Sequence, residues 1–251
     1  MTPHVLILCY HAVSERWPCD LAVTPEQLER QLRIVMGRGY RGTRFHEAVT
    51  SPPHARTVAV TFDDAYRSVL ELAFPILSSL GLPGTVFVPT SFPGAETPMA
   101  WPGIDHWLGG PYEGELEPMS WDELRRVAAA GWEVGSHTRS HPRLPGLADA
   151  ALADELRGSR ADCEHRLETE CRSLAYPYSD ADPRVAEAAR AAGYEAGAAI
   201  RPRLDPRPRL AWPRVAVYRG EPDWRFRLKV APAVRRLRTS RAWPAVKRVL
   251  G

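Results

Sequence analysis

The sequence feature that most constrains the fold is an apolar run ending in two adjacent carboxylates, residues 58–64 (VAVTFDD). A short β-branched run bounded by polar residues is typical of a buried strand. Buried parallel strands of α/β folds carry their functional groups at their C-terminal ends. We therefore expect Asp63 and Asp64 at the mouth of a parallel sheet or barrel. Two adjacent carboxylates repel each other when dry, so the pair needs water, a shared proton or a cation.

Residues that could hold a cation follow a second strand-like run, 132–135 (WEVG). The next stretch, 136–142 (SHTRSHP), contains His137 and His141. One carboxylate and two imidazoles are a plausible ligand set for a zinc-like ion with open positions. Taken alone, an Asp-Asp pair is most often a turn or a helix cap, and a His-x-x-x-His pair can lie on one solvated helix face. Both motifs directly follow strand-like runs, which favours the metal site.

Three motifs in this order resemble the successive motifs of the polysaccharide deacetylase family, whose catalytic module is the NodB homology domain. They are residues 61–66 (TFDDAY), 136–142 (SHTRSHP) and 175–178 (AYPY). The resemblance covers roughly residues 5–217. It implies an α/β fold, a distorted TIM-like (β/α) barrel.

The resemblance also implies the roles of the site residues. Asp64, His137 and His141 would hold a divalent metal, for which we expect Zn²⁺, and Asp63 would be the catalytic base. Such an ion lowers the pKa of its water to about 7 and polarises the carbonyl of an amide. The backbone N–H of Tyr178 would complete an oxyanion hole.

The chain departs from the family pattern in two places. Many members have Arg-x-Pro-Tyr where residues 175–178 read Ala-Tyr-Pro-Tyr, so the arginine that pairs with the base is missing there. Many members have Leu-x-His where residues 210–212 read Leu-Ala-Trp, so the general acid is unassigned. We consider Arg214 as the replacement positive charge from a neighbouring strand. We consider His11 as the acid, or as the group that orients the water.

Substrate-binding candidates lie outside the metal motifs. His11 ends the strand-like run 5–10. A single His there is often structural, but family members commonly begin with a similar Tyr-His, so we assign it to substrate or metal-water contact. Residues 89–119 form a long loop rich in Pro and Gly, and loops of this length are usually functional. Its aromatic residues, Trp101 among them, could stack on a sugar ring or pack the loop onto the barrel. We add Tyr176 to the substrate-binding candidates.

Strand-like and helix-like segments alternate along the chain, which is the pattern of a barrel. Capping signals predict helices that begin after Thr24 and Ser120. Pro75 is expected to kink a third helix or shift its register. The expected helices are 25–36, 68–80, 120–130, 148–170 and 182–192, and the expected strands are 5–10, 57–62, 85–88, 132–135, 173–175, 194–200 and 212–217.

A chain of 251 residues with 44% hydrophobic content suits one barrel better than two small domains. We expect a catalytic barrel over residues 1–220 and a basic tail over 221–251. The four cysteines lack Cys-x-x-Cys spacing, which argues against a zinc ribbon or a redox motif and for free thiols. The N-terminus does not read as a signal peptide, and no apolar stretch reaches about 18 residues. We therefore expect a cytoplasmic protein.

The net charge of +3 hides an asymmetry between the body and the tail. From residue 201 onward there are fifteen Lys/Arg against three Asp/Glu, and before it eighteen against twenty-seven. Residues 225–251 carry nine Lys/Arg and no acid, and their apolar residues could form a stripe on helices interrupted by Pro232 and Pro244. Two interpretations stay open. The tail associates peripherally with the anionic inner face of a membrane, or its stripe packs on the barrel or on a second subunit. Nucleic acid is not an expected partner, because the body is acidic and no recognised motif accompanies the charge.

These features together predict a hydrolase of non-peptide amide bonds. We expect it to use a divalent metal to remove an N-acyl group, expected to be acetyl, from an amino sugar or glycan precursor. Two alternatives are a catalytically silent carbohydrate-binding module of the same fold and a metal hydrolase of a non-sugar amide. Retention of Asp63 argues against the silent module, because a protein without catalysis has no obvious need for a second carboxylate there.

Overall fold

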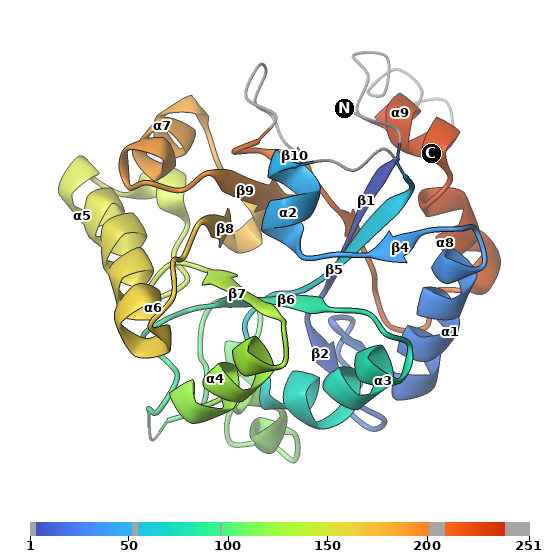
Figure 1. Cartoon of the computed structure of the whole chain (residues 1–251). Helices are drawn as coiled ribbons and strands as arrows, with labels where there is room; N and C mark the ends of the chain where they lie inside the picture. Colours follow the sequence, from blue (N-terminus) through green and yellow to red (C-terminus); the bar gives the residue numbers. More distant parts are fainter. Residues whose placement is uncertain (1–3, 52–54, 96, 201–208, 239–251) are drawn as a thin grey trace, which may run out of the picture.

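A computed structural model describes residues 4–51, 55–95, 97–200 and 209–238, which form a nearly closed barrel of eight parallel strands surrounded by helices (Figure 1). The strand order is β10-β9-β8-β7-β6-β5-β1-β11, and the short β4 pairs in parallel with the start of β5. This confirms the expected α/β barrel. The strands of this sheet in the described residues are β1 (Val5–Tyr10), β4 (Arg41–Gly42), β5 (Thr57–Phe62), β6 (Gly84–Val88), β7 (Glu133–Ser136), β8 (Ser173–Ala175), β9 (Ala196–Ala199), β10 (Trp212–Pro213) and β11 (Val215–Ala216).

One extended segment brings the two ends of the sheet together. β10 pairs with β9, and β11 pairs with β1. Arg214 lies between the two short strands, and its backbone N–H donates to the carbonyl oxygen of Ala199 (2.8 Å). The single strand expected over 212–217 is therefore split in two, because its halves pair with opposite neighbours.

Helices cover the outside of the sheet, and a small two-stranded sheet, β2 (Ala12–Val13) with β3 (Ala22–Val23), lies beyond β1. None of the described helices is both long and apolar enough to span a bilayer. The α-helices are α1 (Pro25–Met36), α2 (Phe45–Thr50), α3 (Phe74–Ser79), α4 (Trp121–Ala129), α5 (Asp149–Ala153), α6 (Ser159–Leu167), α7 (Pro183–Ala191), α8 (Asp223–Lys229) and α9 (Pro232–Arg238). Two π-helical turns are η1 (Val69–Ala73) and η5 (Asp154–Gly158), and four 3-10 turns are η2 (Asp105–Trp107), η3 (Glu113–Leu116), η4 (Leu144–Gly146) and η6 (Pro177–Ser179).

Local signals in the sequence explain where several helices begin and bend. The hydroxyl oxygen of Thr24 accepts from the backbone N–H of Gln27 at the start of α1. Ser120 and Glu123 form the complete reciprocal capping box of α4. The π turn η1 directly precedes α3, whose second residue is Pro75, so the expected shift of register at this proline is confirmed.

The interior of the barrel is closed at its N-terminal end by α2, a helix that the sequence did not predict. Phe45, Ala48 and Val49 of α2 belong to one apolar cluster with Val5 and Ile7 of β1. In Figure 1, α2 lies across the middle of the ring of strands. Side chains alternate along a strand, so every second residue of β1 after Val5 and Ile7 also points into the barrel, towards its C-terminal end. The candidate site lies there.

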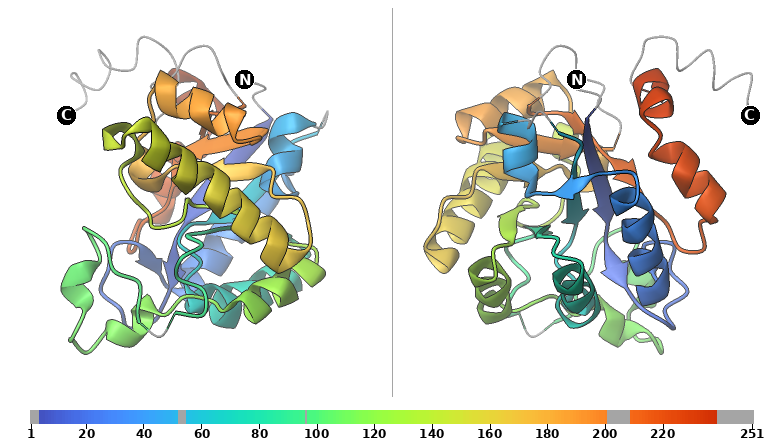
Figure 2. Two further views of the ribbon diagram at one scale, coloured as in Figure 1. Left: turned by 90° about the vertical axis from the view of Figure 1, so that its left-hand side faces the viewer. Right: turned by 45° about the vertical axis from the view of Figure 1, so that its right-hand side comes forward.

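The described part of the basic tail packs on the barrel. Phe226 of α8 and Val230, which directly follows the helix, are buried against the core. Trp224 and Leu228 are exposed on the same helix. Figure 2 shows α8 and α9 on the outside of the molecule, with α8 next to α1. The interpretation that the stripe packs on the barrel is thus confirmed for Phe226 and Val230 but not for Leu228. The tail's last apolar residues, Trp243, Val246 and Leu250, lie outside the described residues.

Candidate metal centre and active site

Asp64, His137 and His141 come together at the C-terminal ends of their strands. The Oδ1 atom of Asp64 lies 3.3 Å from Nε2 of His137 and 3.4 Å from Nε2 of His141. All three side chains are buried, and the three ligand atoms lie within 4.8 Å of one another. Within the described residues, Asp64 Oδ1 is a buried oxygen without a hydrogen bond of good geometry.

This arrangement fits a divalent cation. Zinc ligands lie about 2.0–2.2 Å from the metal, which places two ligands of a tetrahedral site about 3.4 Å apart. The two Asp64–His separations have this length. A buried carboxylate oxygen with no hydrogen bond, facing two imidazole nitrogens, needs a positive partner, which a cation would supply. Three protein ligands would leave a position open for water or substrate.

The two imidazoles are held by their surroundings. Nδ1 of His137 donates to the carbonyl oxygen of Ala175 (2.8 Å), and because a carbonyl only accepts, Nε2 is the nitrogen left for a metal. The ring of His141 stacks on Trp101 with centroids 4.2 Å apart, and the edge of Tyr178 packs on it at 4.7 Å. Both rings are thereby fixed before a metal binds.

The pKa values of the two histidines move in opposite directions. Burial lowers the pKa of His141 to about 3, which keeps it neutral as a metal ligand must be. Burial also lowers the pKa of His137, but the close carboxylate of Asp64 (3.3 Å) and the charge of Asp63 outweigh it and raise the pKa overall. A proton and a metal ion therefore compete for Nε2 of His137, and a metal that binds there displaces the proton.

Backbone strain is concentrated at the site. Non-glycine residues rarely adopt positive φ, and each such residue costs about 1–3 kcal/mol. Seven non-glycine residues in the described chain do so, and all but Glu168 belong to the three motifs or directly adjoin them. The six are Asp64, Ala65, Thr138, His141, Tyr178 and Ser179. The strained turns after β5, β7 and β8 therefore orient the side chains of the site residues.

Asp63 is paired with Arg214 across the barrel. Nη1 of Arg214 lies 2.6 Å from Oδ1 of Asp63 and Nη2 lies 2.7 Å from Oδ2, so both guanidinium nitrogens engage both carboxylate oxygens. Both side chains are buried. Burial raises the pKa of Asp63, but the charge of Arg214 outweighs it and holds the pKa well below its usual range. The chain thus supplies from its last strand segment the arginine that is missing at residue 175.

We expect Arg214→Ala to lower turnover while leaving the metal site filled, because the charge that fixes Asp63 is lost but no ligand is touched. Removing one partner of a buried ion pair typically costs about 3–5 kcal/mol of stability. Arg214→Lys should recover only part of the activity, because lysine keeps the charge but lacks the planar fork. Thermal unfolding, metal content and turnover of both variants check this. Wild-type turnover in Arg214→Ala would show that the pair has no catalytic role.

The other predicted site residues lie in different environments. Nε2 of His11 is 3.9 Å from Oδ2 of Asp63, and its side chain is partly exposed at the mouth. Tyr178 lies in η6, packed against the metal cluster. Trp101 is buried against the imidazole ring of His141, so the structure favours the alternative in which this residue packs the loop onto the barrel. Tyr176 is buried, and its hydroxyl donates to the carbonyl oxygen of Leu210 (2.8 Å), which favours a structural role over the predicted contact with substrate.

Sequence reasoning missed two groups beside Asp63. The thiol of Cys9 lies 3.5 Å from Oδ2 of Asp63, and burial raises the pKa of that thiol. The hydroxyl of Thr61 receives a hydrogen bond from Nη1 of Arg214 (3.1 Å). The alternation of side chains along a strand could have indicated both. Cys9 lies two residues before His11, which directly follows β1, and Thr61 lies two residues before Asp63, which directly follows β5.

The fold and site define a parallel α/β barrel with a buried Asp-His-His cluster beside an ion-paired carboxylate. The family model for polysaccharide deacetylases matches residues 50–197, which is more than half of the chain. The chain therefore belongs to the polysaccharide deacetylase family. It is 23% identical over 201 residues to YxkH of Bacillus subtilis, a protein named as a candidate polysaccharide deacetylase. The match covers 78% of this chain and 64% of that relative's length.

Solved structures of similar fold support the architecture. A polysaccharide deacetylase from Bacillus cereus aligns with a TM-score of 0.73 at 21% identity, over 90% of this chain and 68% of that one. The deacetylase PplD of Streptococcus pyogenes, solved with acetate, aligns at 0.71 and 19% identity over 94% and 98%. IcaB of Ammonifex degensii aligns at 0.71 and 24% identity over 91% and 97%. At these identities the likeness is one of fold.

Proposed function

We propose that this chain is a divalent-metal-dependent hydrolase that removes an N-acetyl group from an amino sugar within a glycan or glycan precursor. Family membership supports deacetylation of a sugar polymer. The observation that carries the proposal is the buried cluster of Asp64, His137 and His141 next to the carboxylate of Asp63, itself held by Arg214. The acetate in the PplD structure supports acetyl as the group removed.

Amide hydrolysis needs an activated water, stabilisation of the oxyanion and a proton for the amine. A divalent cation at the cluster would lower the pKa of water and polarise the carbonyl. Asp63 takes the proton of the attacking water. Oδ1 accepts one bond from Arg214 and keeps a further lone pair for this purpose, whereas Oδ2 accepts from both Arg214 and the thiol of Cys9. Arg214 also keeps the carboxylate of Asp63 ionised, and only the ionised carboxylate can accept the proton. The backbone N–H of Tyr178 donates to the oxyanion.

We assign the proton donor for the amine to His11. Its Nε2 lies 3.9 Å from Asp63, at the mouth, where a sugar nitrogen would leave. In the segment where the family's usual histidine motif falls, the chain has Trp212, which is buried and cannot donate a proton to the site. As the C–N bond breaks, the nitrogen takes the proton of His11, and acetate and a free amine are released.

We expect His11→Asn to lower amide hydrolysis by about 10²–10⁴-fold, the usual loss when a general acid is removed. The same variant should lose much less on 4-nitrophenyl acetate, whose phenolate leaves without a proton, whereas a variant of Asp63 should lose activity on both substrates. Steady-state rates on the two substrates separate these roles. Equal losses of His11→Asn on ester and amide would show that His11 does not act as the acid.

The substrate class is tested by measuring acetate released from a panel of N-acetylated sugars. The panel holds free N-acetylglucosamine, its oligomers and polymers, nucleotide-linked and lipid-linked forms, and non-sugar acetamides. We expect release from the glycan forms. Binding of glycans without release, by protein loaded with metal, would favour the silent binding module. Release from non-sugar amides alone would favour the third interpretation.

We further propose that the protein acts in the cytoplasm. The four cysteines, Cys9, Cys19, Cys163 and Cys171, are all free and buried, which suits a reducing compartment. Fractionation of cells that produce the full chain checks this. Recovery of the active protein outside the cytoplasmic membrane would contradict it.

A further inference from the structure

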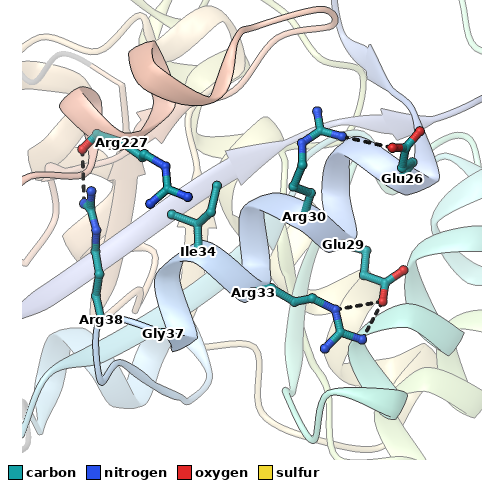
Figure 3. Close-up of a pocket in the computed structure, with 8 residues that line it drawn as sticks. All are labelled: Glu26, Glu29, Arg30, Arg33, Ile34, Gly37, Arg38 and Arg227. Carbon is teal, nitrogen blue, oxygen red and sulfur yellow. Dashed lines mark hydrogen bonds and ion pairs between the residues drawn. The ribbon is translucent and has the colours of Figure 1, made fainter.

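We propose that the outer face of α8, together with the groove between α8 and α1, is a docking surface for an anionic lipid bilayer. The groove has a volume of about 510 Å³ and is lined by residues of α1, of the turn that follows it and of α8, among them Ile34, Arg38 and Arg227 (Figure 3). We call the exposed pair Trp224 and Leu228 and this groove the α8 face. It is separate from the metal centre, and no residue of it enters the proposed chemistry.

The apolar half of the α8 face is a pair of side chains one helical turn apart. Trp224 is 67% exposed and Leu228 is 53% exposed, and residues four apart lie on one side of a helix. Phe226 on the opposite side of α8 and Val230, directly after the helix, already belong to the core, so packing on the barrel does not account for the outer pair. Single exposed apolar residues are normal on any surface. Here, four of the five large apolar side chains that are exposed in the described residues fall within 218–237.

The charged half of the α8 face has arginines in excess over acids. Arg30 pairs with Glu26 of α1 (3.3 Å) and with Asp223 of α8 (2.9 Å). Arg33 pairs with Glu29 of α1 (2.6 Å). Arg38 donates instead to the backbone carbonyl oxygen of Arg227 (3.1 Å), as Figure 3 shows. In the part of the chain that the structure describes, neither Arg38 nor Arg227 has a carboxylate partner. Their remaining N–H groups can donate to the phosphate oxygens of lipid headgroups.

The sequence around the α8 face continues the same charge. Residues 225–251 contain nine Lys/Arg and no acid, whereas the chain before residue 201 has nine more acids than bases. An anionic surface would therefore attract the tail and repel the body, which orients the molecule. Exposed Trp and Leu side chains set among basic residues are typical of interfacial binding, in which the apolar side chains enter the headgroup region. A nucleic acid would use the charge but gives no reason for the exposed apolar pair.

The position of α8 brings a docked bilayer close to the mouth. β11 runs parallel to β1, so the chain leaves β11 at the end of the barrel that holds the site and then enters α8. α9 lies at the other end, where Arg235 donates to the carbonyl oxygen of Val5 at the start of β1. Trp224 is in the first turn of α8 and is therefore on the mouth side. Figure 2 shows both helices along the outer side of the barrel.

The test is co-sedimentation of the full chain with phosphatidylcholine vesicles that contain or lack phosphatidylglycerol. We expect binding only to the anionic vesicles. It should weaken as salt shortens the screening length from about 10 Å at 0.1 M to about 3 Å at 1 M. No binding to anionic vesicles at low salt, or equal binding to neutral ones, would overturn the proposal.

Two double variants locate the surface. Trp224→Ser with Leu228→Ser, and Arg38→Gln with Arg227→Gln, should each weaken vesicle binding by about tenfold or more, while each protein still binds metal. Matched controls are Leu108→Ser, which changes another exposed leucine (41%), and Arg126→Gln on α4. Both controls should bind vesicles as the wild type does.

Three results with these variants would contradict the assignment. Wild-type vesicle binding by both double variants would mean that another surface binds lipid. A wild-type dimer that becomes monomeric on changing Trp224 and Leu228 would make the α8 face a subunit interface. Tighter binding of the wild-type chain to single-stranded RNA than to anionic vesicles, lost in the arginine variant, would mean that the surface serves a nucleic acid.

Discussion

His137→Ala should bring the metal content of the purified protein from about one divalent ion per chain to near zero, and the deacetylase activity to background. The variant removes one of three ligands, and with it the imidazole whose orientation is fixed by the carbonyl of Ala175. A carboxylate and one histidine are too few to hold an ion in an open site. Asp64→Ala and His141→Ala should have the same effect.

Elemental analysis of the protein after loading with zinc measures this outcome directly. The matched control is His165→Ala, which removes an exposed histidine on α6 and should leave metal and activity unchanged. If His137→Ala or His141→Ala still held one ion per chain with wild-type activity, the three residues would not form the metal site.

The second large effect is expected from Asp63→Asn. The amide keeps the size of the carboxylate and its one oxygen can still accept one bond from Arg214, but it cannot take the proton of the attacking water. Turnover should fall about 10²–10⁴-fold, the usual range for a lost general base, while the metal stays bound. Steady-state rates and metal content of the same preparation check both halves of the expectation.

The ion pair makes a stability control necessary for this variant. Asp63→Asn leaves the buried charge of Arg214 without its anion, and breaking such a pair typically costs about 3–5 kcal/mol. A second variant with Arg214→Met added should regain stability, because an apolar side chain of similar length replaces the unpaired charge. Its turnover should stay low. Recovery of turnover in the double variant would mean that Asp63 is structural and not the base.

The parts of the fold that the sequence predicts are those set by local patterns. Apolar runs mark most strands of the barrel, and the capping residues Thr24 and Ser120 mark where two helices begin. The cluster of candidate ligands could be predicted because the two motifs that contain them directly follow strand-like runs, and parallel strands bring their C-terminal ends together. The family motifs then add the separate roles of Asp63 and Asp64.

Other parts depend on contacts between segments far apart in the chain. α2 is only six residues long, and it forms where Phe45 can fill the open end of the barrel. β10 and β11 are split because they pair with opposite neighbours, and Arg214 between them contacts a carboxylate 151 residues away. Trp101 lies in a long loop, and nothing in the loop's sequence indicates that its ring stacks on His141. Such features follow from tertiary packing and carry little local signal.

The tail illustrates the same division. Its charge can be counted in the sequence, and its helical spacing predicts an apolar stripe. Which residues of that stripe face inward depends on how α8 lies against α1. The structure places Phe226 inside and Trp224 outside, although both are large aromatic residues two positions apart.

The central claim is that a divalent ion at Asp64, His137 and His141 is required for deacetylation, and a zinc titration tests it most directly. Metal would first be removed from the full-length protein with a chelator, and zinc would then be added back in steps while acetate release from an N-acetylated oligosaccharide is measured. We predict no release from the metal-free protein, and activity that rises with added zinc and levels off at about one ion per chain. Undiminished acetate release by the metal-free protein would contradict the account.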